Sequence, residues 1–167
     1  MNRIAALKLG VAATAAALGL YIGAVSACGY DSPMADLVVA HPRSIEVALA
    51  VRDAYDHGEL QALAPVPPVL GLVRAKGMLQ NFRPLLTAVA GSPNTSVAVL
   101  LIEEGLWARY SMSAAGMATE LHVEGPLDGE PVIVTSEATL RALLDGAMTP
   151  TRATELGVLI VVRPTWS

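Results

Sequence analysis

The sequence predicts an α+β fold in which helices pack on one face of a mostly antiparallel sheet. Three observations favour this class. Apolar residues recur at helical spacing through 44–57 and 69–82, and from residue 95 onward the pattern changes to alternating and continuous aliphatic runs. Two short helical segments with clear start and stop signals then precede a final aliphatic strand that ends near residue 162.

The first helix is expected over 44–57. Ser44 provides a start signal, Glu46 complements the positive end of the helix dipole, and Gly58 provides a stop. A short strand at 36–40 is expected before it.

A proline-rich segment separates the two helices. The prolines within 64–68 lack amide donors and favour extended backbone, so this segment is interpreted as a connector inside one domain. The second helix is expected over 69–82, and Pro84 should bend it or begin a new turn through 85–90.

Four strands are expected to follow. The first is a continuous aliphatic run, the second alternates between two faces, and turn-forming residues separate the later ones. Their predicted ranges are 96–103, 106–113, 117–123 and 130–135.

The C-terminal part carries strong capping signals. Ser136 can cap a helix that runs to Leu144, and Gly146 can end it. Thr149 followed by Pro150 repeats this logic for a second short helix. The last strand is expected at 158–162.

The N-terminal segment has the parts of an export signal. Arg3 and Lys8 form a short basic start, 9–27 contains no charged residue, and small residues precede the chain's only cysteine, Cys28. The order Val25-Ser26-Ala27-Cys28 resembles the lipobox of bacterial lipoproteins. The resemblance implies cleavage before Cys28, diacylation of its thiol, and acylation of the new amine by a fatty acid such as palmitate.

Two other interpretations of this segment stay open. Its 19 uncharged residues, 9–27, are close to the roughly 20 that span a bilayer, so it could be a retained membrane helix, or else a buried helix of a soluble domain. The preceding basic residues favour export of the remainder. We expect a signal peptide or membrane anchor at 1–27, a tether at 28–40 and one α+β domain at 41–167, on the periplasmic or extracellular side of a bacterial cell envelope.

Charge and cysteine content disfavour several classes of binding partner and cofactor. Removal of 1–27 leaves 140 residues with nine basic and 15 acidic side chains, a net charge of −6, which disfavours nucleic acid. Lys76 is then the only lysine, so no polybasic patch is expected, and the membrane is expected to hold the chain through its N-terminal lipid or helix. With Cys28 modified, no thiol is left for a disulfide or a soft metal, and no cofactor is expected.

The sequence contains no recognisable catalytic motif, and we expect a protein that is not an enzyme. Asp53 and His57 are i and i+4 on one helix face, but no further metal ligand has motif spacing to them, so the histidine is interpreted as a favourable charge at a helix end. Glu103 and Glu104 are interpreted as a solvated turn, because adjacent strand residues point to opposite faces.

The candidate interface consists of Trp107, Arg109 and Tyr110. Trp107 and Arg109 are two residues apart on one strand face, and an exposed tryptophan beside an arginine is enriched at protein interfaces. In the alternative arrangement, Trp107 covers the sheet beneath a helix while Arg109 pairs with an acidic neighbour.

The C-terminal pattern resembles the end of sterol carrier protein domains, within 95–163 at most. That family ends in a fixed order of elements: a strand, a short helix, a glycine, a second short helix near a proline, another glycine and a closing strand. Residues 132–162 match this order. The resemblance implies a sheet with a hydrophobic tunnel for a lipid or acyl chain. Ala147 departs from the family, where a lysine is often found.

The expected function is that of a non-enzymatic, membrane-tethered envelope lipoprotein, which binds a protein partner or serves as an accessory component. A lipid or hydrophobic-ligand binding protein of sterol-carrier type and a single-helix accessory subunit of a membrane complex are the alternatives. A continuous apolar cavity would distinguish the first alternative, and the fate of the N-terminus would distinguish the second.

Overall fold

The structure, a computed structural model, describes residues 41–86, 96–113 and 116–164, all of which belong to one compact unit. The helices are α3 (Ser44–Asp56), α4 (Pro68–Asn81), α6 (Glu137–Leu144) and α7 (Pro150–Glu155), with a 3-10 turn η1 (Arg83–Leu85) after α4. The strands are β1 (Ser96–Leu101), β2 (Leu106–Ser113), β3 (Gly116–Leu121), β4 (Val132–Thr135) and β5 (Leu159–Val162). The strand predicted at 36–40 lies outside the described residues.

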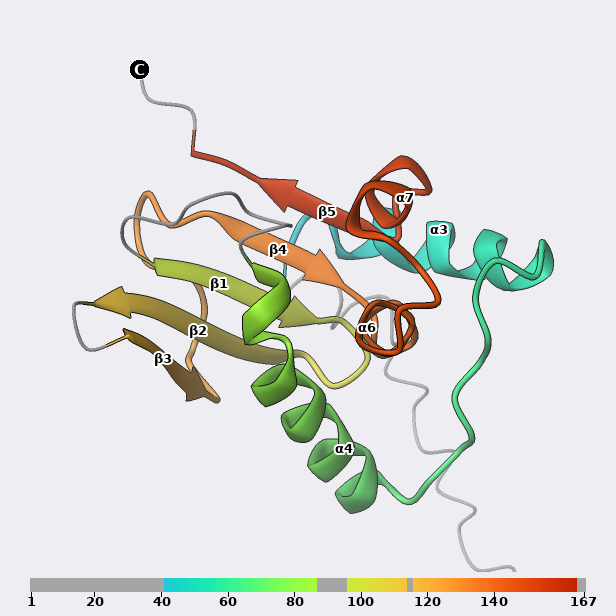
Figure 1. Cartoon of the computed structure of the whole chain (residues 1–167), viewed down its shortest axis with the longest axis horizontal. Coiled ribbons are helices and arrows are strands. Elements are labelled where there is room, and N and C mark those ends of the chain that lie inside the picture. The colour runs from blue at the N-terminus through green and yellow to red at the C-terminus, as the bar shows by residue number, and fades with distance from the viewer. Residues whose placement is uncertain (1–40, 87–95, 114–115, 165–167) are drawn as a thin grey trace, which may run out of the picture. The chain divides into compact units, whose positions relative to one another are not determined.

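The five strands form one sheet in the order β3-β2-β1-β4-β5 (Figure 1). β1, β2 and β3 make an antiparallel meander, and β4 pairs antiparallel with β5. β1 and β4 are parallel neighbours, so the chain crosses from the β3 edge to the other side of β1 before β4 begins. The predicted α+β class with a mostly antiparallel sheet is confirmed.

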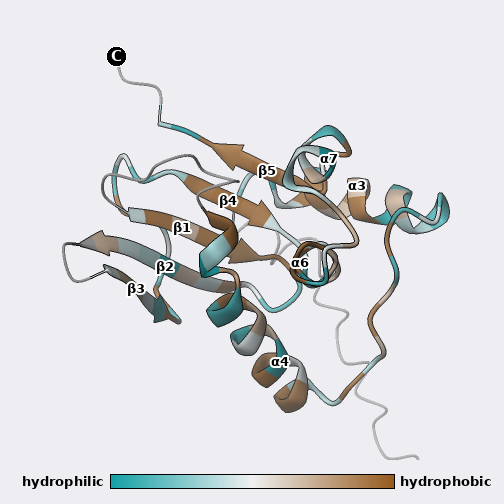
Figure 2. Cartoon of the chain, in the orientation of Figure 1, coloured by the Kyte–Doolittle hydropathy of each residue, from teal (hydrophilic) through white to brown (hydrophobic). Residues whose placement is uncertain are grey.

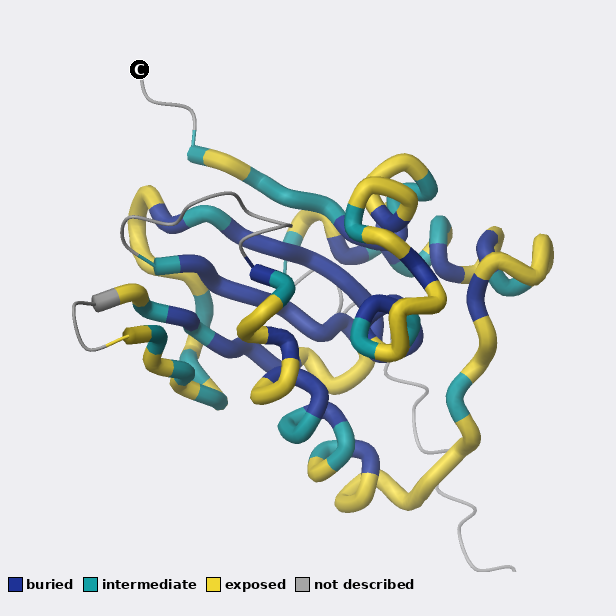
Figure 3. Tube along the Cα trace, viewed as in Figure 1, coloured by how far each residue is buried: buried dark blue, intermediate teal, exposed yellow. Residues whose placement is uncertain are grey.

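The centre of the sheet is buried on both faces. Every residue of 97–101 in β1 and every residue of β4 is buried, which appears as dark blue in Figure 3. On one face, the Tyr110 hydroxyl donates to the Leu79 carbonyl of α4 at 2.6 Å. On the other, the Trp107 ring makes an edge contact with His41, which leads into α3, at 6.3 Å between ring centroids. α4 therefore covers one face of β2, and the segment that precedes α3 contacts the other.

α3 starts and stops where the sequence predicts, but without a side-chain cap. Arg43 occupies the N-cap position, and Ser44 is the first helical residue, with a buried Oγ that has no hydrogen-bond partner among the described residues. Glu46 pairs with Arg43 at 2.8 Å. Gly58 follows the helix with φ +73°, a left-handed conformation that glycine adopts without strain.

The predicted caps of α6 and α7 are confirmed. Ser136 Oγ accepts a hydrogen bond from the Thr139 N–H at 3.0 Å, and Thr149 Oγ1 accepts one from the Arg152 N–H at 3.2 Å. Each satisfies a backbone donor that the first turn of a helix leaves open.

Some boundaries differ from the prediction. α4 begins at Pro68, and Pro84 lies within η1, so a new turn does begin there, although 87–95 lie outside the described residues. β3 ends at Leu121 rather than at 123, because His122 has φ +63° and the chain leaves the extended conformation there.

The helices within the described residues are all too short or too polar to cross a membrane. The signal or anchor segment expected at 1–27 and the tether at 28–40 lie outside the part of the chain that the structure describes.

Candidate functional site

An exposed apolar surface lies at the start of α4. Val66 is 40% exposed, Val69 74%, Leu70 55% and Val73 61%, and we call these four residues the apolar patch. The first turns of α4 are accordingly brown in Figure 2 and largely yellow in Figure 3. Contiguous apolar side chains on a protein surface commonly mark a binding site.

The apolar patch is presented by a firmly packed helix. The opposite side of α4 buries Ala75, Met78 and Leu79. The Leu79 carbonyl accepts the Tyr110 hydroxyl bond, and the Phe82 and Tyr110 rings meet edge-on with centroids 6.4 Å apart. These contacts fix the rotation of α4 about its axis, so the patch faces away from the sheet for a structural reason.

Arg74 ties the start of α4 to α6. Its Nε and Nη2 donate to Glu137 Oε2 at 3.0 and 2.5 Å, and its Nη1 donates to the Ala64 carbonyl oxygen at 3.0 Å. Glu137 is only 2% exposed, so Arg74 rather than water compensates its charge. One guanidinium therefore holds both α6 and the proline-rich segment that carries part of the apolar patch.

Three carboxyl groups meet where the turn between β1 and β2 reaches α6. Both carboxylate oxygens of Glu103 accept from the Glu137 backbone N–H, at 3.1 and 3.0 Å. Loss of water around the carboxyl raises the pKa of Glu103 to about 7, although that N–H bond opposes the rise. Burial, and then the charge of Glu137, also raise the pKa of Glu104. Glu137 Oε1 is buried without a hydrogen-bond partner among the described residues.

The turn predicted for Glu103 and Glu104 is confirmed, but the argument that their side chains point to opposite faces is wrong. Both residues lie in a turn and are exposed, but a turn lacks strand alternation, and both carboxyl groups interact with Glu137. The Glu104 carboxyl group also lies against α4, because a Cβ atom at Gly71 would be 3.5 Å from Glu104 Oε1, an ordinary contact distance. The arrangement can bind and release protons near neutral pH.

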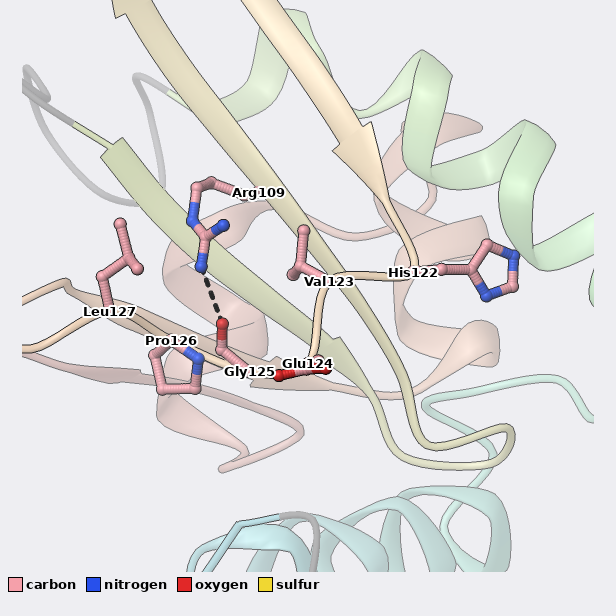
Figure 4. Close-up of a pocket in the computed structure, with 7 residues that line it drawn as sticks. All are labelled: Arg109, His122, Val123, Glu124, Gly125, Pro126 and Leu127. Atoms are coloured by element: carbon pink, nitrogen blue, oxygen red, sulfur yellow. Dashed lines mark hydrogen bonds between the residues drawn. The ribbon is translucent and has the colours of Figure 1, made fainter.

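An open depression of about 600 Å³ lies between β2 and the loop after β3 (Figure 4). Arg109 occupies it with all three nitrogens near partners: Nε donates to Glu130 at 3.1 and 3.2 Å, Nη2 donates to the Gly125 carbonyl at 2.8 Å, and Nη1 lies 3.8 Å from Glu120 Oε2. The His122 ring points away from Arg109. The arginine here fastens the loop to the sheet and offers no free donor set to a ligand.

The candidate interface residues do not form an exposed surface together. Trp107 is 7% exposed and Tyr110 2%, and the Arg109 side chain is 14% exposed and paired with Glu130. Arg109 thus follows the alternative arrangement, with an acidic partner. Burial raises the pKa of Tyr110, which keeps its hydroxyl protonated as the donor to α4.

Asp53 and His57 remain an exposed pair at the end of α3. His57 Nδ1 lies 2.9 Å from the Asp53 carbonyl oxygen and 3.5 Å from Asp53 Oδ1. The bond to that carbonyl, and then the Asp53 charge, raise the pKa of His57, which suits a positive charge at a helix C-terminus. Within the described ranges, no group of three histidine, cysteine or acidic side chains is arranged to hold a metal ion.

The C-terminal element order that suggested sterol carrier domains is present: β4, α6, a glycine, α7, a second glycine and β5. Comparison with models of protein families gives no match, and comparison with curated proteins gives none either. Cys28, on which the lipoprotein resemblance depends, lies outside the described residues.

Sequence reasoning missed the apolar patch and the role of Glu137. A signal for the patch was available, because residues 61–73 contain no charge and include closely spaced prolines. An uncharged stretch usually predicts burial, so only the structure reveals that its side chains are exposed. Glu137 was recognised as a first-turn acidic residue, but its contact with Arg74 joins positions 63 residues apart.

Proposed function

We propose that this chain is a non-enzymatic lipoprotein of a bacterial cell envelope. Cleavage before Cys28 and acylation of that residue attach it to a membrane. The domain at 41–167 stands on the exported side, where it serves as a binding or accessory component.

The observation that carries the proposal is the position of the chain's only cysteine. Cys28 follows two small residues and an aliphatic one, at the end of an uncharged segment with a basic start. An unselected sequence would seldom place its single cysteine at this point of an export signal. A binding role gains support from the apolar patch, which a folded domain holds exposed.

A non-catalytic role fits the use that the domain makes of its least exposed charges. Within the described residues, Arg74 and Arg109 pair with Glu137 and Glu130, whose side chains are 3% and 2% exposed. Each arginine also donates to a backbone carbonyl of a loop. These ion pairs hold loops against helices and strands, as structural charges do.

The test is the intact mass of the full-length chain recovered from bacterial membranes. We expect the wild-type protein to lack residues 1–27 and to carry acyl chains, and Cys28→Ala to stay unprocessed. Ala27→Gly is the matched control, because it keeps a small residue before the cysteine and should be processed normally. An unmodified wild-type mass that retains Met1 would overturn the proposal and favour a single-helix subunit of a membrane complex.

A further inference from the structure

The charge of this chain is unevenly distributed. Its 15 acidic residues include none between Glu59 and Glu103, a stretch that contains Arg74, Lys76 and Arg83. The apolar patch lies inside this stretch, and α4 itself carries no acidic residue. Within the acidic domain at 41–167, the stretch 60–102 is therefore rich in apolar residues and carries only positive charges.

One of these three cations accompanies the apolar patch on the same side of α4. Val69, Val73 and Lys76 are spaced i, i+4 and i+7, which places them along one stripe of a helix. Arg74 is engaged with Glu137, and the Arg83 guanidinium donates to the Met117 carbonyl of β3. In the described part of the chain, Lys76 has no hydrogen bond or ion pair, so its charge is available to a partner.

We infer that the apolar patch and Lys76 rest on the surface of the anionic lipid bilayer to which Cys28 is attached. The inference builds on the proposed function and names what the exposed face of the domain contacts. Helices that lie in a membrane interface combine an apolar face with basic residues beside it, as the start of α4 does. The patch orients the domain, while the lipid on Cys28 supplies the anchorage.

The length of the connecting segment favours a bilayer over a soluble partner. Cys28 and His41 are 13 positions apart, so a fully extended connector spans at most about 45 Å. The domain is thereby held beside the bilayer at a high local concentration, and a weak contact suffices to keep it there. A soluble partner would have no such advantage.

Environment-sensitive probes on the full-length lipoprotein test the inference. Acylation consumes the thiol of Cys28, so Val73→Cys introduces the only free thiol for labelling. Leu49→Cys is the matched control, because Leu49 on α3 is 62% exposed, against 61% for Val73, and has acidic Glu46 and Asp53 at helical spacing to it. Each labelled protein is reconstituted into vesicles of phosphatidylethanolamine and phosphatidylglycerol without other proteins.

We expect the probe at position 73 to shift its emission to the blue and to become several-fold less accessible to an aqueous quencher than the probe at position 49. Replacement of Val69 and Leu70 by serine together with Lys76→Gln should abolish the difference. Equal behaviour of the two probes in a protein of proven Cys28 acylation would overturn the inference and leave the proposed function intact. A shift seen only in native membranes would assign the patch to a protein partner, and an unacylated Cys28 would overturn the proposed function itself.

Discussion

The ion pair between Arg109 and Glu130 allows a direct test of how burial sets the strength of charge interactions in this fold. Arg109→Leu would leave the Glu130 carboxylate, whose side chain is 2% exposed, with the Leu127 N–H at 2.8 Å as a remaining donor. Removing one partner of a buried pair costs about 3 to 5 kcal/mol, and the surviving N–H bond places the expected loss near the lower end, at about 3 kcal/mol. For a domain of this size, that corresponds to a fall in Tm of about 10 °C.

Arg141→Leu is the matched control. Arg141 and Asp145 approach more closely, at 2.6 Å against 3.1 Å, but their side chains are 56% and 53% exposed. We expect a loss of less than about 0.5 kcal/mol in this case. Thermal and urea unfolding followed by circular dichroism would measure both variants, and Arg109→Leu combined with Glu130→Leu should regain much of the loss. Equal losses for the two single variants would refute the reasoning, because the exposed pair would then contribute as much as the buried one.

Three further predictions concern a carboxyl group, a hydroxyl group and the backbone conformation at glycine. Because the folded state raises the pKa of Glu103 from 4.5 to about 7, it binds a proton there more tightly than the unfolded chain, so stability should fall as pH rises between these values. Glu103→Gln should flatten this dependence of the unfolding free energy on pH. In urea unfolding at pH 8 it should raise the unfolding free energy by about 1 kcal/mol, after allowance for solvent exposure. An unchanged pH dependence would mean that other groups cause it. Tyr110→Phe should lower the unfolding free energy by about 1 to 2 kcal/mol in the same assay, because the 2.6 Å hydrogen bond to the Leu79 carbonyl is lost. An unchanged unfolding free energy would mean that this bond contributes nothing. Gly146→Ala should destabilise the fold by about 1 kcal/mol, because φ at this position is +70°. Gly77→Ala should stabilise it by about the same amount, because Gly77 lies inside α4 with open space around it. Effects of the same sign would contradict the conformational argument.

The sequence predicts much of the secondary structure because the signals are local. Ser136 and Thr149 stand next to the backbone donors that they satisfy, so their helices could be placed from a few neighbouring residues. The alternation through 106–113 likewise reflects the two faces of one strand. Strand order is a different matter, since the parallel pairing of β1 with β4 depends on contacts between distant segments.

The candidate site was less predictable for the same reason. Whether Trp107 is exposed depends on what covers it, and the ring of His41, 66 positions earlier in the chain, contacts it. The pKa of Glu103 depends on α6, which follows 34 positions later. The exposure of Val69 and Val73 depends on which side of α4 packs against Tyr110. Sequence patterns reveal side-chain type and spacing, but not the neighbours that tertiary packing supplies.

The position of β1 at the middle of the sheet has a consequence for the order in which the chain can fold. β1 obtains one neighbour at once from β2, but its other edge stays open until β4 arrives, and 30 residues separate Leu101 from Val132. A growing chain that ends before β4 leaves the aliphatic edge of β1 without backbone partners, so the sheet closes only after β4 has been synthesised. For the lipoprotein proposed above, export in extended form would require a core that has not yet assembled, and the late arrival of β4 would meet that requirement.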